Sequence, residues 1–140
     1  MENTIKTIFA ALVTLFTYLF GGADMWLIAL VTVIVIDYAT GLARAYIQAE
    51  LSSKIGFKGI VKKLTYFALV AVAVIADNIA GASGMLRVAV IGFLIANEAL
   101  SILENYAAAT GQKAPAILIN ILNKLKDDGD KENIEFKQRE

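Results

Sequence analysis

Four long apolar stretches run along the chain, each separated from the next by a segment that carries charge. Residues 7–23, 25–36, 64–76 and 88–97 contain no formal charge. An α-helix of about 20 residues crosses the roughly 30 Å hydrocarbon layer of a membrane. Extended through their mildly polar ends, the four stretches reach that length. The pattern predicts membrane helices over residues 4–21, 25–47, 60–80 and 85–106.

A shorter amphipathic segment follows the fourth stretch. Gly111 is typical of a helix end and Pro115 of a first helical position. Over residues 115–126 apolar side chains recur at helical spacing, which predicts an interfacial helix too short to span. Residues 127–140 hold nine charged residues and no apolar core, so we expect a disordered tail. The predicted fold class is an all-α integral membrane protein, with a helical membrane domain over residues 1–126.

Two alternatives compete with this architecture. The first stretch has some features of a signal peptide, but Thr14, Thr17 and Tyr18 interrupt it and no A-x-A cleavage pattern lies near Gly21. The four helices could also form a soluble bundle. Helices that are apolar all round have too little polar surface to shield one another in 140 residues, which argues against that bundle.

Lysines gather in one of the predicted connections. Residues 48–63 contain four lysines against Glu50, whereas the other two connections between the predicted spans contain no lysine or arginine. The positive-inside rule places this connection in the cytoplasm, and the helix count then places both termini there. If residues 4–21 lie on the membrane surface instead, three spans remain and the N-terminus moves outside. The lysines expected to contact anionic lipid headgroups are Lys54, Lys58, Lys62 and Lys63.

Polar residues inside the second predicted helix share one face. Asp37, Thr40, Gly41 and Arg44 are separated by spacings that bring them to one side of a helix. An uncompensated Asp or Arg at mid-bilayer costs about 2.5–3.5 kcal/mol, so these charges need partners. A contact between Asp37 and Arg44 would have to reach across about two helical turns. A partner on another helix or another subunit is an equally good expectation.

The fourth predicted helix repeats this pattern, with two polar lines along its surface. Such residues normally face a helix bundle, another protomer or water. They either complete ordinary packing within one chain or are completed only in an oligomer. The candidate pore and assembly residues are Asp37, Thr40, Gly41, Arg44, Asp77, Arg87, Asn97, Glu98, Ser101, Glu104 and Asn105.

The composition excludes several classes of function. The chain is 58% hydrophobic and 19% charged, with no cysteine, no histidine and a formal net charge of +0. Disulfides, thiolate metal sites and Ser-His-Asp chemistry are therefore excluded. The zero net charge argues against a nucleic-acid partner. Residues 51–63 lack the G-x-x-x-x-G-K-[ST] pattern of a phosphate-binding loop. We predict no catalytic site, no metal site and no cofactor.

Several segments carry a resemblance to a known family. They are Asp-Tyr-Ala-Thr-Gly at 37–41, Ser-Ser-Lys-Ile-Gly-Phe-Lys-Gly-Ile-Val-Lys-Lys at 52–63, Asp77, Ala-Asn-Glu-Ala-Leu-Ser-Ile-Leu-Glu-Asn at 96–105, and Pro115. In this order they resemble the toxin-secretion/phage-lysis holin family. The resemblance implies a non-enzymatic, phage-encoded protein of the host inner membrane that forms homo-oligomers among the lipids. It also implies lesions through which an endolysin, or in some relatives a large toxin, leaves the cell.

The expected mechanism turns on the polar faces. We expect protomers to hide these faces against one another and, above a critical density, to turn some of them toward water, with the second and fourth helices lining the breach. The main rival is a small four-helix transporter, a class that needs a carboxylate in its first helix, and residues 4–21 contain none. A membrane adaptor that recruits a partner through its tail is the second rival. A holin passes proteins and dyes, a transporter passes only small substrates, and an adaptor passes neither.

Overall fold

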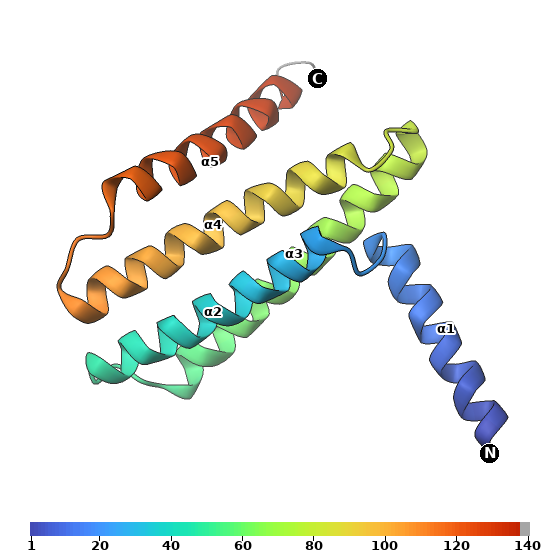
Figure 1. Ribbon diagram of the computed structural model, residues 1–140, viewed down its shortest axis with the longest axis horizontal. Coiled ribbons are helices and arrows are strands. Elements are labelled where there is room, and N and C mark those ends of the chain that lie inside the picture. The colour runs from blue at the N-terminus through green and yellow to red at the C-terminus, as the bar shows by residue number, and fades with distance from the viewer. Residues whose placement is uncertain (138–140) are drawn as a thin grey trace.

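Five α-helices account for nearly all of the chain that the computed structural model describes, which is residues 1–137, with the side chains of residues 54, 55, 125 and 128–137 left aside (Figure 1). The all-helical fold class is confirmed, and the described residues form no strand. The helices are α1 (Glu2–Phe20), α2 (Met25–Ile47), α3 (Ser53–Ala80), α4 (Met85–Thr110) and α5 (Ala116–Lys137).

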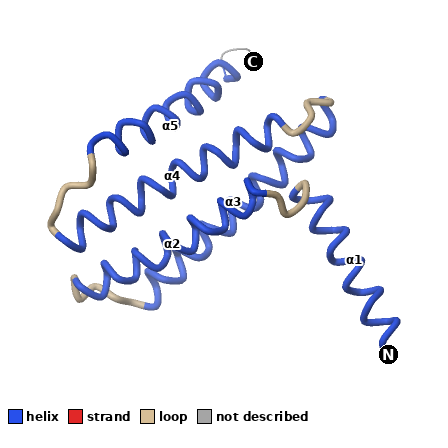
Figure 2. Tube along the Cα trace, in the orientation of Figure 1, coloured by secondary structure: helices blue, strands red, loops and turns tan. Residues whose placement is uncertain are grey.

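Helix α4 lies at the centre of the arrangement. It packs against α2 and α3 on one side and runs beside α5 on the other (Figures 1 and 2). Apolar side chains from α2, α3 and α4 meet in one buried core, and aromatic residues such as Phe20 and Phe67 pack around its edge. The core residues are Leu30, Ile34, Tyr66, Val70, Ile91 and Leu94.

Many large apolar side chains lie on the outer faces of the helices. Val35 of α2 is 61% exposed and Val72 of α3 is 63% exposed, and many other large apolar side chains share this position. Four helices, α1 to α4, are long and apolar enough to cross a membrane. Exposed apolar surface on this scale is costly in water and is what lipid requires, so the chain is a multi-pass membrane protein rather than a soluble bundle.

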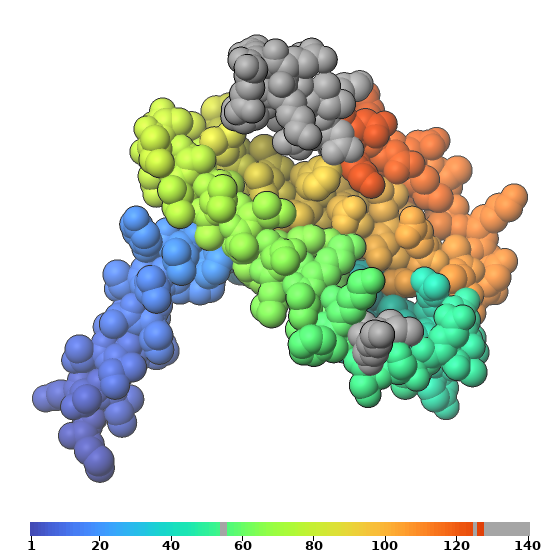
Figure 3. Space-filling model, turned by 180° about the vertical axis from the view of Figure 1, so that it is seen from behind, coloured from blue at the N-terminus to red at the C-terminus, as the bar shows by residue number. Residues whose placement is uncertain are grey.

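Helix α1 projects from the body as a separate arm (Figures 1 and 3). None of its residues is buried. It is anchored at its C-terminal end, where the ring of Phe20 packs edge-on against Phe67 of α3 with 6.0 Å between centroids. Whether α1 spans the bilayer or lies on its surface stays a prediction.

Helix α3 begins at Ser53 rather than at residue 60, so the lysine-rich segment is mostly helix and not loop. Two glycines of this segment lie beside Tyr38 of α2. A Cβ added at Gly56 would lie 3.4 Å from the Tyr38 hydroxyl, and one at Gly59 would lie 3.8 Å from the Tyr38 ring. Both glycines therefore lie against Tyr38, at distances where a Cβ would make an ordinary van der Waals contact.

Helix α5 continues to Lys137, beyond the end at residue 126 that the apolar pattern predicted. Most of the segment expected as a disordered tail is therefore helical, and residues 138–140 lie outside the described part. No proline interrupts this segment. Helix α4 is also longer than predicted and ends at Thr110.

Candidate functional site: a buried ion cluster between three helices

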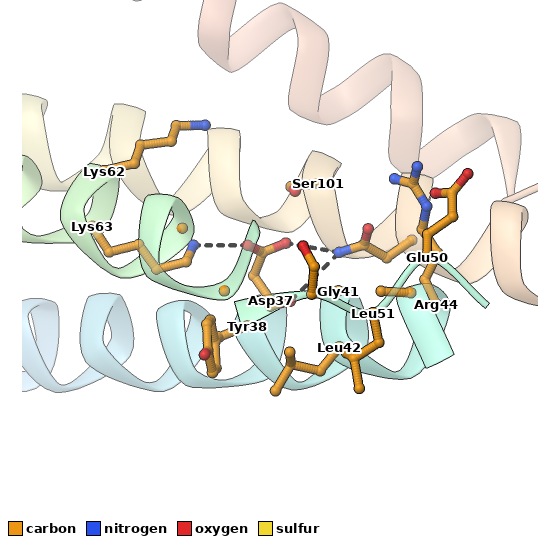
Figure 4. Close-up of a pocket in the computed structure, with 15 residues that line it drawn as sticks. Asp37, Tyr38, Gly41, Leu42, Arg44, Glu50, Leu51, Lys62, Lys63 and Ser101 are labelled. Carbon is orange, nitrogen blue, oxygen red and sulfur yellow. Dashed lines mark hydrogen bonds and ion pairs between the residues drawn. The ribbon is translucent and has the colours of Figure 1, made fainter. Parts of the chain in front are cut away.

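Lys63 of α3 joins two carboxylates that come from two other helices. Its ammonium donates hydrogen bonds to Asp37 Oδ2 of α2, at 2.7 Å, and to Glu98 Oε2 of α4. All three residues are buried, with exposed fractions of 9% for Lys63, 8% for Asp37 and 1% for Glu98. Figure 4 shows the Lys63 side chain reaching toward Asp37. We refer to these three residues as the Lys63 cluster.

Uncharged polar groups complete the Lys63 cluster on both sides. Asn105 Nδ2 donates to Asp37 Oδ1 at 3.1 Å and to Thr40 Oγ1 at 3.3 Å. On the other side, Asn97 Nδ2 donates to the Tyr66 hydroxyl at 3.1 Å, and that hydroxyl interacts with Glu98. No buried side-chain nitrogen or oxygen among the described residues lacks a partner. The cluster is therefore a fully hydrogen-bonded network.

The cluster lies deep within the predicted membrane layer. Asp37 and Glu98 are near the middle of the 23-residue α2 and the 26-residue α4, and Lys63 is in the first half of the 28-residue α3. A single uncompensated charge at such a depth costs about 2.5–3.5 kcal/mol. Separating the three helices would leave each charge without its partner. The pairing therefore holds α2, α3 and α4 together in one register.

A cavity of about 310 Å³ connects this region with the α2–α3 connection (Figure 4). Asp37 and Lys63 line its inner part, and exposed residues of the connection, including Glu50 and Leu51, line its outer part. The wall also contains Arg44, whose Nε donates to Gln48 Oε1 at 3.1 Å. Water at the α2–α3 end can therefore approach Asp37 and Lys63.

A second polar cluster lies at the opposite end of the bundle. Arg87 of α4 donates to the carbonyl oxygen of Phe20 at 2.6 Å and to that of Gly22 at 3.2 Å. Its two terminal nitrogens also reach the Asp24 carboxylate, at 2.7 and 2.9 Å. Asp77 accepts hydrogen bonds from the backbone N–H groups of Leu86 and Arg87, which satisfies the N-terminus of α4. We refer to Arg87, Asp24 and Asp77 as the Arg87 cluster.

Local backbone and charge both favour the Arg87 cluster. Gly21 adopts a left-handed conformation with φ of 73°, and a Cβ there would lie 2.9 Å from Arg87 Nε, so glycine permits the approach. Asp24 also caps α2 by accepting from the Leu27 N–H at 3.0 Å. The hydrogen bonds from Arg87, assisted by that cap, lower the pKa of Asp24 to about 2. The ion pair therefore persists throughout the neutral and mildly acidic range.

The structure brings most of the predicted polar residues together, but in two places. The Lys63 cluster and its neighbours contain Asp37, Thr40, Asn97, Glu98 and Asn105, whereas Asp77 and Arg87 belong to the Arg87 cluster. Three further predicted residues line the cavity, and Glu104 is exposed on α4 outside both clusters. The three that line the cavity are Gly41, Arg44 and Ser101.

The expectation for Lys63 is corrected by these contacts. It was expected at lipid headgroups, but it is buried and paired with two carboxylates. Adjacent residues on a helix point about 100° apart, so Lys63 faces inward while Lys62 is exposed. Lys58 is exposed as well, and the side chain of Lys54 lies outside the described residues. Headgroup contact by Lys58 and Lys62 stays a prediction.

Sequence reasoning missed Lys63, Tyr66 and Asp24 as members of these clusters. A signal for the first two was present in the helical spacing of α3, where Lys63, Tyr66 and Val70 share the buried face. The structure also places the partner of Asp37 on another helix of the same chain. Within a single chain, these polar groups are therefore satisfied without a second copy.

Comparison with known proteins gives the family of the chain. It matches the bacteriophage holin family over residues 14–127. An uncharacterised protein of Listeria monocytogenes is 44% identical over 122 residues, covering 87% of this chain and 86% of the relative. A protein of Bacillus phage phi105 named "Probable holin" is 38% identical over 113 residues, covering 81% of this chain and 82% of the relative.

The match to another bacterial protein extends over nearly the full length of that protein. An uncharacterised 14.9 kDa protein of Clostridium perfringens is 40% identical over 129 residues, covering 89% of this chain and 97% of the relative. No solved structure matches the chain. Given the family match over most of its length and the lipid-compatible helices that carry it, the chain belongs to the bacteriophage holin family, a family of non-enzymatic membrane proteins.

Proposed function

We propose that this protein oligomerises in the cytoplasmic membrane of the host cell and opens lesions that release an endolysin, or in some contexts a toxin. Membership of the holin family supports this proposal, and so does the phage relative named as a holin. Endolysin is a functional partner here, and no direct contact between the two proteins is implied. In this function the protein acts on the membrane itself and requires no cofactor.

The observation that carries the proposal is the Lys63 cluster. Three ionisable side chains lie at mid-depth in helices whose outer faces are apolar, and they are buried against one another within one chain. A protomer in this state presents an apolar exterior to lipid and accumulates without leakage. Separating α2 from α3 and α4 would expose charged groups that prefer water to lipid. Several protomers in that second state can line a water-filled breach.

This mechanism differs from the expectation that polar faces are first hidden between copies. The energy barrier to lesion formation lies inside each protomer, because intramolecular pairs must separate first. Asp37, Thr40 and Asn105 on the inner faces of α2 and α4 are then available to the water of the breach. Contacts between protomers involve the exposed apolar side chains, including those of α1, none of whose residues is buried.

The proposed topology places the α2–α3 connection and both termini in the cytoplasm. Lys58 and Lys62 lie exposed on the first turns of α3, at the end of the bundle where the positive-inside rule expects basic residues. A reporter that is active only outside the cytoplasm, fused after Glu140, should be silent. Activity of that reporter would contradict the topology.

Inducible expression with and without a cytoplasmic cell-wall hydrolase tests the function. Optical density should stay steady and then fall abruptly in cells that contain both proteins. In cells without the hydrolase, dyes and a cytoplasmic reporter protein should cross the membrane at the same time. Leakage of small ions alone would indicate a transporter, and an intact membrane would indicate an adaptor. Gradual leakage in proportion to protein from the first minutes would contradict a threshold.

A matched pair of variants connects lysis with the Lys63 cluster. In Glu98→Leu the closed bundle keeps the Lys63–Asp37 ion pair, whose net charge is zero. The open state loses a polar side chain that would face water. We expect this variant to insert but to delay or abolish lysis. Glu104→Leu changes the same residue type on the same helix at an exposed position, and it should lyse with nearly normal timing. Equal timing in the two variants would remove Glu98 from the mechanism.

A further inference from the structure

The charges in the Lys63 cluster do not balance. Asp37 and Glu98 supply two carboxylates, while Lys63 supplies one ammonium. The other cations near this end are directed elsewhere, because Arg44 bonds to Gln48 and Lys62 is exposed. Arg87 is occupied at the far end, and no side chain that the structure describes on α5 forms an ion pair with the cluster. A fully ionised cluster would carry one excess negative charge.

An excess charge at this depth is removed most readily by a proton. Buried ionisable groups in an apolar medium neutralise rather than remain charged and unpaired. Two carboxylates that share one site also disfavour each other's ionised forms. We propose that the Lys63 cluster is a proton-binding site, in which Glu98 takes up one proton and stands neutral beside an ionised Lys63–Asp37 pair.

Two observations assign the proton to Glu98 rather than to Asp37. Glu98 is the more deeply buried of the two, with 1% exposure against 8%. Asp37 also lines the cavity, whereas Glu98 does not. The neutral acid keeps polar neighbours, since Lys63 and Tyr66 both contact it.

The cavity supplies a route for the proton. It reaches from the exposed residues of the α2–α3 connection to Asp37 and Lys63, which lie directly beside Glu98. Uptake is a simple addition, in which the carboxylate and one proton from this water give the carboxylic acid. The titratable groups that face Glu98 are Asp37 from α2 and Lys63 and Tyr66 from α3. Acidification at this end therefore favours the closed bundle, and alkalinisation leaves a buried negative charge.

Infrared spectroscopy of the full chain in lipid nanodiscs tests this inference without any need for lesion formation. A protonated carboxylic acid gives a carbonyl-stretch band that an ionised carboxylate lacks. At neutral pH the protein should show this band, with an intensity of one acid per chain. Carboxyl labelling with carbon-13 in glutamate alone should shift the band, and labelling in aspartate should leave it in place. This labelling requires no substitution, so it is independent of the folding of a variant.

Variants then locate the proton. Glu98→Gln should abolish the band, while the exposed control Glu104→Gln should keep it. Lys63→Met should raise the intensity to two acids per chain, because Asp37 then loses its cation and protonates too. Absence of the band at neutral pH would overturn the proposal. A shift on aspartate labelling, or survival of the band in Glu98→Gln, would overturn the assignment to Glu98.

Discussion

The two polar clusters of this protein both pair charged side chains within the bundle, but their partners and their exposure to water differ. The Lys63 cluster joins side chains from three helices at mid-depth, with no member more than 9% exposed. The Arg87 cluster lies at the helix ends, where backbone carbonyl and N–H groups supply many of the partners and the Asp24 side chain is 44% exposed. Water can replace a lost partner more readily at the helix ends than at the centre, where Glu98 is only 1% exposed. The central cluster should therefore dominate the energetics of the closed bundle.

Substitution of Lys63, the cation of the central Lys63 cluster, should have the largest effect on the free energy of unfolding. Lys63→Met leaves the buried Asp37 carboxylate without its cation and Glu98 without its donor, and breaking a buried pair in this way costs about 3–5 kcal/mol. Its neighbour Lys62 is exposed, so Lys62→Met should change the free energy of unfolding by about 0.5 kcal/mol or less. Unfolding in mixed micelles, followed by circular dichroism, measures both. Equal stability of the two variants would show that the central cluster contributes little.

Substitution of Arg87, the cation of the Arg87 cluster at the helix ends (the terminal cluster), should have an intermediate effect on the free energy of unfolding. Arg87→Met loses hydrogen bonds to Asp24 and to two carbonyl groups, and bonds to charged groups contribute about 1.5–3 kcal/mol. Part of this is recovered by water, so the loss should be smaller than for Lys63→Met. Arg44→Met is the control, because Arg44 bonds only to Gln48 among the described side chains. A loss for Arg87→Met greater than for Lys63→Met would reverse the comparison.

A pair of glycine variants sharpens the picture of the terminal cluster. Gly21 and Gly111 both end helices in the left-handed conformation, with φ of 73° and 70°. Alanine strains the backbone equally at both positions, but only at Gly21 does the new Cβ meet Arg87. Gly21→Ala should therefore cost about 1 kcal/mol more than Gly111→Ala, the typical contribution of one hydrogen bond. The same unfolding assay applies, and equal costs would argue against a tight Arg87 contact.

The smallest predicted effect is the change in stability with pH that Asp24 of the Arg87 cluster contributes. The pKa of Asp24 is lowered from 3.8 to about 2 by Arg87, so its stabilising ionisation is complete above 3.8 and is lost as the pH falls toward 2. The carboxyl carbon resonance of Asp24, followed by NMR in micelles, should titrate near 2 in the native chain. In Arg87→Gln the midpoint should rise toward 3.8. A native midpoint near 3.8 would mean that the ion pair does not form in solution.

The architecture could be predicted from sequence where the apolar pattern is uninterrupted. The bounds of α2 agree with the predicted helix, whose first twelve residues carry no charge and whose start is capped by Asp24. The start of α3 was missed because lysines and glycines interrupt the apolar pattern over residues 54–63, although this segment packs against Tyr38 of α2 as a helix. The role of Lys63 was missed because it depends on packing between helices. Its difference from Lys62 depends on which helices surround α3, which no local pattern reveals.

The candidate site was predicted in part. Asp37, Glu98 and Asn105 were identified because charged and amide side chains are rare in membrane helices, and their depth alone indicates a function. The sequence left their partner open between another helix and another subunit. Choosing between these needed the packing of α3 against α4, which decides that a lysine of the same chain reaches both carboxylates.

A direct contact measurement tests the central claim that one chain satisfies its own buried charges. Solid-state NMR can detect the dipolar coupling between lysine Nζ and side-chain carboxyl carbons, with one chain per nanodisc. A Lys6→Gln background removes the surface pair between Lys6 and Glu2. The account predicts a strong coupling that Lys63→Met abolishes and Lys62→Met preserves. Coupling that is absent from single chains and appears only when several chains share a bilayer would contradict it.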